Sequence, residues 1–230
     1  NAISQAITVT HTFQDATTAS AAEVNQNFND IVTGVNAIVR KDDTLFNTAT
    51  GAFAINPNIT TTGNFNTANG YDALYNNTSG SQNSAVGYQA LRANIAGDAN
   101  TAIGYSALLS NIGSFNTAIG ADALSENTAG GFNTASGTSA LVNNTEGNHN
   151  TASGFSALGF NSTGNSNTAI GSDALYKNTE GNSNTASGTN ALFSNTTGGD
   201  NTAIGYSADV TSGALTNATA IGYNAKVSAS

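Results

Sequence analysis

The chain has 230 residues and a formal net charge of −9, and only 8% of its residues are charged, against about 25% in an average globular domain. No basic stretch is present to neutralise phosphates, and no apolar run is long enough for a membrane-spanning helix. The absence of Cys excludes disulfides and thiol chemistry. Asn, Thr and Gly number 35, 32 and 25, a composition typical either of disorder or of an ordered repeat of small polar residues.

Residues 1–19 are predicted to be an N-terminal strand segment. Apolar side chains at Ile7, Val9 and Phe13 alternate with threonines, which is a strand pattern. We expect this strand to pair with another subunit by strand addition near residues 219–227, or to fold back onto its own first repeat near Thr48.

Residues 20–43 predict an amphipathic helix that begins with a capping box at Ser20 and Glu23. Its apolar side chains follow a 4-3-4-3 spacing that continues for about two heptads. This spacing favours either a short trimeric coiled coil or a helix that caps the end of the repeat region. The residues of the expected oligomer interface are Val24, Phe28, Ile31, Val35 and Ile38.

Residues 44–230 consist of an internal 17-residue repeat. The string Thr/Ser-Ala-x-Gly recurs from Thr67 to Thr219, and a degenerate copy starts at Thr48, which gives about eleven units. The steps are 17 residues, except for 16 between Thr101 and Thr117, because of a deletion near residues 111–113, and 19 between Thr48 and Thr67. A second Ala, a Leu, an Asn and a closing Gly recur at fixed offsets inside most units.

A 17-residue unit rich in Asn, Thr and Gly is too short for a helical hairpin and fits one coil of a parallel β-solenoid. The Thr-Ala-x-Gly and x-Ala-Leu-x segments are the expected strands, and the Asn- and Gly-rich segments are the expected turns. Equivalent residues stack on successive rungs, so asparagines can form hydrogen-bonded ladders. The expected repeat core contains Leu74, Leu91, Leu108, Leu124, Leu141, Leu158, Leu175 and Leu192.

Each coil has only Ala, Gly and Leu for its core, which is thin. We therefore expect copies of the chain to associate, as a homotrimer, as a head-to-tail filament, or as both. A self-sufficient monomeric solenoid is the alternative.

The Thr-Ala-Ile-Gly-x-x-Ala units, as at residues 101–107 and 202–208, resemble the head repeats of trimeric autotransporter adhesins (the YadA-like β-roll) and the repeats of phage and bacterial tail fibres. This resemblance covers nearly the whole repeat region and implies a left-handed parallel β-roll of three chains that binds host surfaces or matrix. The 17-residue unit is longer than is usual in that family. The chain also lacks a neck, a stalk and a membrane barrel, so we interpret it as a head fragment or as a free secreted protein.

The sequence contains no motif for a catalytic triad, a phosphate-binding loop or a zinc site. We therefore expect no enzyme activity, no cofactor and no metal. Asp72, Asp122 and Asp173 share one repeat position but lie on rungs that are not adjacent. We interpret them as solubilising charges, and Asp98 and Asp200 are weak candidates for calcium ligands. Sequons for N-glycosylation occur at Asn58, Asn76, Asn143, Asn161, Asn195 and Asn217.

The sequence thus predicts a non-enzymatic, extracellular or cell-surface fibre or head module that self-assembles and presents a repetitive surface for attachment to a host surface, matrix or glycan. The alternative is an ice- or glycan-binding solenoid, because the leading Thr or Ser of every unit falls in a single column. Ice binding requires a flat, doubled Thr column that faces outward; the sequence shows only one clear column and leaves its direction open.

Overall fold

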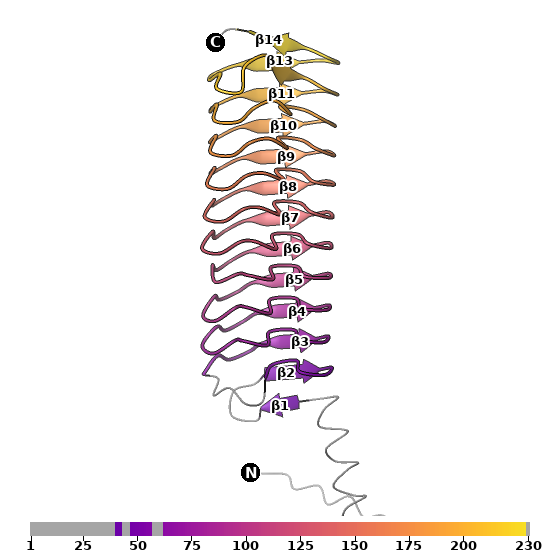
Figure 1. Ribbon diagram of the computed structural model, residues 1–230, viewed down its shortest axis with the longest axis vertical. Helices are drawn as coiled ribbons and strands as arrows, with labels where there is room; N and C mark the ends of the chain where they lie inside the picture. Colours follow the sequence, from indigo (N-terminus) through magenta and orange to yellow (C-terminus); the bar gives the residue numbers. More distant parts are fainter. Residues whose placement is uncertain (1–39, 43–46, 57–61, 229–230) are drawn as a thin grey trace, which may run out of the picture. The chain divides into compact units, whose positions relative to one another are not determined.

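The computed structural model describes residues 40–42, 47–56 and 62–228 (Figure 1). The chain divides into two compact units, Asn1–Asn36 and Ala37–Ser230, and every described residue belongs to the second. The strands are β1 (Arg40–Asp42), β2 (Asn47–Thr50), β3 (Thr67–Asn69), β4 (Ser84–Val86), β5 (Thr101–Ile103), β6 (Thr117–Ile119), β7 (Thr134–Ser136), β8 (Thr151–Ser153), β9 (Thr168–Ile170), β10 (Thr185–Ser187), β11 (Thr202–Ile204), β12 (Asp209–Val210), β13 (Thr219–Ile221) and β14 (Lys226–Val227).

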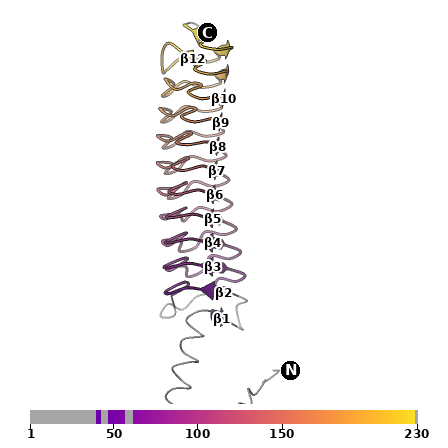
Figure 2. The same cartoon turned by 90° about the vertical axis from the view of Figure 1, so that its right-hand side faces the viewer.

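One coil of chain follows another in a parallel β-solenoid, as the repeat predicts. The main sheet has 12 strands in the order β1 to β11 followed by β13, and every pair in it is parallel except β1 with β2. The register joins equivalent repeat positions, so Thr67 pairs with Ser84 and Ser84 with Thr101. Figures 1 and 2 show the resulting column of rungs from two sides.

Each strand alternates in burial, and this alternation decides which side chains form the core. In β5 the Ala102 side chain is buried while Thr101 and Ile103 face solvent, and the other Thr/Ser-Ala-x strands follow the same pattern. The Gly after the strand has to be Gly because the rungs approach closely there. Gly104 has a φ of 141°, and a Cβ atom on it would clash with the carbonyl oxygen of Gly120 on the next rung.

The Ala-Leu segment is not the second strand that the sequence predicts. All eight leucines are fully buried, but each has a φ between 49° and 54° in a turn. The backbone of this turn still bonds to the next rung, as where the Leu91 N–H donates to the Ala107 carbonyl at 3.0 Å. A second strand forms only late in the chain, where β12 pairs in parallel with β14.

Two columns of buried asparagines run along the inside of the coil and confirm the predicted ladders. In the first, the backbone N–H of each Asn donates to the side-chain oxygen of the Asn one rung earlier, as from Asn83 to Asn66 at 2.9 Å. In the second, side-chain amides bond directly to one another, as from Asn94 to Asn77 at 2.8 Å. These ladders satisfy polar groups in an interior that has little apolar surface.

The range predicted as an amphipathic helix, residues 20–43, is wrong at its C-terminal end. Arg40–Asp42 form β1, which pairs antiparallel with β2 with Asp42 opposite Asn47. The five apolar helix residues from Val24 to Ile38, and Ile7, Val9 and Phe13 of the N-terminal strand segment, lie outside the described residues.

Candidate attachment surface

The outward face of the main sheet presents two columns of side chains. The first contains the Thr or Ser that begins each strand, so this column faces solvent rather than the core. The second contains residues two positions later, among them Val86, Ile103, Ile119 and Ile204, which are 40–45% exposed. Because the strands are in register, both columns repeat at the strand spacing of about 4.8 Å.

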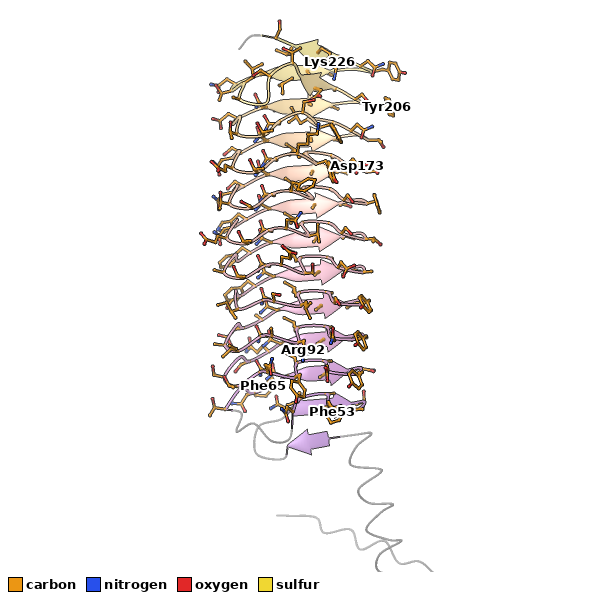
Figure 3. All side chains as sticks on the ribbon, in the orientation of Figure 1. Phe53, Phe65, Arg92, Asp173, Tyr206 and Lys226 are labelled. Carbon is orange, nitrogen blue, oxygen red and sulfur yellow. The ribbon has the colours of Figure 1, made fainter. Side chains whose placement is uncertain are left out.

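Two rows of stacked tyrosines lie beside this face, at the corner that follows the strands. We call them the tyrosine rows: Tyr71, Tyr88 and Tyr105 form one, and Tyr206 and Tyr223 form the other. Neighbouring rings are 5.3–5.5 Å apart between centroids and nearly parallel, with interplanar angles of 7–14°. In Figure 3, Tyr206 projects outward from the edge at which the strands end.

A further aromatic row lies at the turn that precedes the strands. Phe115, Phe132 and His149 stack at 4.8 and 4.9 Å, and Phe115 and Phe132 are about half exposed. These residues occupy the same position in successive repeats, and each has a positive φ that turns the chain before the next strand.

Aromatic side chains also gather on the segment that follows the buried leucines. Phe160, Tyr176 and Phe193 contact one another in sequence, with centroid distances of 4.9 and 5.5 Å. The Lys177 ammonium lies 4.8 Å from the centre of the Phe193 ring, a cation–π contact. Exposed aromatic surface is therefore present on several sides of the coil, and most of it recurs at the repeat spacing.

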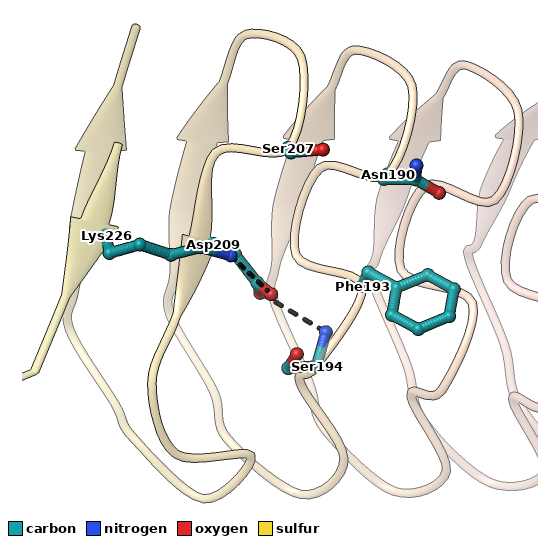
Figure 4. A pocket seen from close by; sticks show the side chains of 6 residues that line it. All are labelled: Asn190, Phe193, Ser194, Ser207, Asp209 and Lys226. Carbon is teal, nitrogen blue, oxygen red and sulfur yellow. Dashed lines mark hydrogen bonds and ion pairs between the residues drawn. The ribbon is translucent and has the colours of Figure 1, made fainter. Parts of the chain in front are cut away.

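A small pocket of about 280 Å³ adjoins Phe193 where the Leu column ends (Figure 4). Asp209 occupies the position that Leu holds in earlier rungs, and its side chain is almost fully buried. The carboxylate accepts hydrogen bonds from the backbone N–H groups of Ser194 and Val210 and pairs with the Lys226 ammonium at 3.2 Å. Three donors thus already satisfy the Asp209 carboxylate. We therefore assign Asp209 a structural role at the rung where strand β12 replaces the Leu turn of the earlier rungs.

The acidic candidates from the sequence do not come together. Asp72 pairs with Arg92 at 3.1 Å, and Asp173 accepts a bond from the Ser172 hydroxyl. The Asp98 carboxylate accepts from the Ser81 backbone, within a row of inter-rung bonds. Within residues 40–42, 47–56 and 62–228, no three His, Asp or Glu side chains are grouped so that they could hold a metal ion.

The glycosylation sequons divide into buried and accessible sites. Asn161 and Asn195 belong to the second ladder and are fully buried, so neither can carry a glycan in the folded coil. Asn217 is exposed, Asn76 and Asn143 are partly exposed, and Asn58 lies outside the described residues.

No described segment forms a helix with the length and hydropathy that a bilayer crossing requires. No family model matches the chain, and neither a curated protein nor a solved structure is significantly similar to it. The class of fold, a parallel β-solenoid of 17-residue rungs, is therefore established by the structure alone.

Proposed function

We propose that this chain is a non-enzymatic structural and adhesive module of an extracellular or cell-surface fibre. The observation that carries the proposal is the set of exposed aromatic rows, of which Tyr71, Tyr88 and Tyr105 form the longest row of tyrosines. Monomeric soluble proteins rarely leave contiguous apolar surface uncovered, and such surface commonly marks an interaction site.

The backbone supports this function because it holds the rows at fixed spacing. Inter-rung hydrogen bonds run along the strands, along the Leu turns and through both Asn ladders. A rigid rod that repeats one weak contact gains affinity through effective concentration, because binding at one rung places the next rung against the same surface. Recognition of a host surface, matrix or glycan by many weak contacts fits this geometry.

Self-association is part of the proposal. The column with Ile103, Ile119 and Ile204 gives the sheet exposed aliphatic side chains, which Ser136, Ser153 and Ser187 interrupt in the middle rungs. Packing this face against copies of the chain removes that surface from water, at about 25 cal/mol per Å². A homotrimer is the form of self-association that such side-by-side contacts favour, whereas a head-to-tail filament would need contacts between the ends of the coil. Sedimentation across a range of concentrations tests this part.

Retention on defined surfaces tests attachment. We would measure binding of the purified chain to cellulose, chitin and phenyl-coated beads. Replacing Tyr71, Tyr88 and Tyr105 by Ser should lower retention at least tenfold, because each ring contributes about 0.5–1.5 kcal/mol to an aromatic contact.

The matched control changes three small residues at the same corner position, Thr138, Ser172 and Thr189, to Ala, and it should bind like wild type. Attachment through the rows is refuted if wild type binds none of the three surfaces, or if the tyrosine variant is retained as well as the control.

Ice or glycan binding by the hydroxyl column is the second candidate. It is favoured by the outward direction of the leading Thr and Ser residues, such as Thr134 and Thr151. Inhibition of ice recrystallisation by wild type, and its loss on Thr134→Leu with Thr151→Leu, would support this candidate over attachment through aromatic rows.

A further inference from the structure

The tyrosine rows have a chemical property that attachment does not use. The chain contains no Cys, Met or Trp, and Cys and Met are the side chains that commonly take up oxidising equivalents in proteins. Tyrosine is therefore the most readily oxidised side chain present. Five of the seven tyrosines belong to the rows, and these residues are 43–76% exposed.

The rows also bring phenols together in pairs. Tyr71–Tyr88, Tyr88–Tyr105 and Tyr206–Tyr223 are stacked with centroids 5.3–5.5 Å apart. The two remaining tyrosines have no tyrosine among their ring contacts: Tyr75 contacts Phe53 and the Arg92 guanidinium, and Tyr176 contacts Phe160 and Phe193.

We propose that the tyrosine rows are a site of oxidative cross-linking, at which a haem peroxidase with hydrogen peroxide joins tyrosines of consecutive rungs as dityrosine. Each phenol gives up one electron and one proton to the oxidised haem and becomes a phenoxyl radical. The two radicals join through the ring carbons ortho to oxygen, and the hydrogen on each of these carbons moves to the phenolic oxygen. Two hydrogen atoms leave the protein, and one hydrogen peroxide is reduced to two waters.

The fold favours coupling within the chain over coupling between chains. The radical on one ring has its partner ring stacked beside it, with centroids 5.3–5.5 Å apart, so intramolecular coupling has a large effective concentration. All five row tyrosines are exposed, so solvent rather than neighbouring side chains covers much of each residue, and tilting from the stacked arrangement to the bonded one meets little obstruction.

A cross-link would change the stability of the rungs that it joins. It closes a loop one repeat long, which restricts the unfolded chain as a disulfide of that loop length does. In a repeat protein the effect is local, because each rung contacts only its neighbours. Five rungs between the rows, with Ala121, Thr138, Phe155, Ser172 and Thr189 at the corner position, carry no tyrosine there and serve as an internal reference.

The test treats the whole chain with a haem peroxidase and hydrogen peroxide, then maps cross-linked peptides by mass spectrometry. We expect dityrosine within single chains at 71–88, 88–105 and 206–223, and slower hydrogen exchange of the joined rungs. Tyr206→Phe keeps a stacked ring but removes one phenol, so it should abolish only the 206–223 link. Tyr176→Phe should leave the pattern unchanged.

A gain-of-function variant makes the test independent of any loss of folding. Thr189→Tyr places a tyrosine one rung before Tyr206 and should create a 189–206 link. Thr138→Tyr stands between Ala121 and Phe155 and should create none. The proposal is overturned if Tyr75 and Tyr176 cross-link as often as the row tyrosines, if the links join different chains only, or if Thr189→Tyr adds no link. These outcomes leave attachment through the rows untouched, because they do not measure surface binding.

Discussion

Removing one asparagine from the middle of the second buried ladder should destabilise the coil far more than an ordinary polar substitution. Asn144 is fully buried, and its amide donates to the side-chain oxygen of Asn127 at 2.7 Å and to the Gly147 carbonyl at 2.9 Å. Its own side-chain oxygen accepts a bond from Asn161 at 2.8 Å. Asn144→Ala therefore deletes three buried hydrogen bonds.

The magnitude follows from which partners are left without a bond. The Gly147 carbonyl still accepts from Asn133, and the Asn161 amide still donates to Gly164. The side-chain oxygen of Asn127 loses its ladder donor, and one of the two amide N–H groups of Asn161 loses its acceptor, in a site that is fully buried. Three bonds at about 1 kcal/mol each, with about 1–2 kcal/mol for each of the two orphaned groups, give a loss of about 5–7 kcal/mol in unfolding free energy.

Urea unfolding followed by far-ultraviolet circular dichroism measures the loss, and hydrogen exchange shows whether it is centred on the rungs next to Asn144. Asn182→Ala is the matched control, because the Asn182 side chain also takes part in three hydrogen bonds but is exposed. Water replaces those partners, so the control should cost less than about 1 kcal/mol. Equal losses for the two variants would refute the view that the buried ladders hold the coil together.

The remaining predictions concern the Leu turns, the glycines that follow the strands, and Asp209 at the start of β12. Leu141→Ala should cost about 2–5 kcal/mol by cavity formation, measured by urea unfolding; a loss under about 1 kcal/mol would mean that the Leu column is not a packed core. Gly137→Ala forces a Cβ to within 2.5 Å of a carbonyl oxygen, whereas Gly222 has a positive φ but open space around it. The Gly137 variant should therefore unfold at clearly lower urea than Gly222→Ala, and equal midpoints would assign the whole cost to φ. Asp209→Ala should expose the β12–β14 region to proteolysis, whereas Asp209→Asn should largely protect it. Only the alanine leaves the Ser194 and Val210 N–H groups without a side-chain acceptor. Equal cleavage of the two variants would contradict this role of Asp209.

Periodicity alone was enough to predict the class of fold. The constant step between Thr-Ala-x-Gly strings places equivalent residues in register, and the inward Ala and the Asn ladders follow from that register. The conformation of the Ala-Leu segment could not be predicted in this way, because Leu rarely adopts a positive φ. Burial of the side chain and bonds to the next rung offset the strain, and both depend on neighbouring rungs.

The candidate surface was only partly visible in the sequence. The 17-residue spacing of Tyr71, Tyr88 and Tyr105 was a signal for a row, but the stacking of their rings depends on the direction of the corner. The two predicted ladders of Asn are buried, so their side chains do not contribute to this surface. The structural role of Asp209 had a signal as well, since Leu is absent from that position in the last two rungs.

The most direct test of attachment by a repeated surface is the dissociation rate as a function of rung number. Variants that lack residues 67–83, or 67–100, lose one or two whole repeats together with Tyr71, or with Tyr71 and Tyr88, and keep the register of the ladders. On whichever of the three surfaces retains wild type, the dissociation rate should rise with each rung removed while the circular dichroism spectrum per residue stays the same, because fewer contacts act together. A dissociation rate that does not depend on the number of rungs would contradict attachment through a repeated surface.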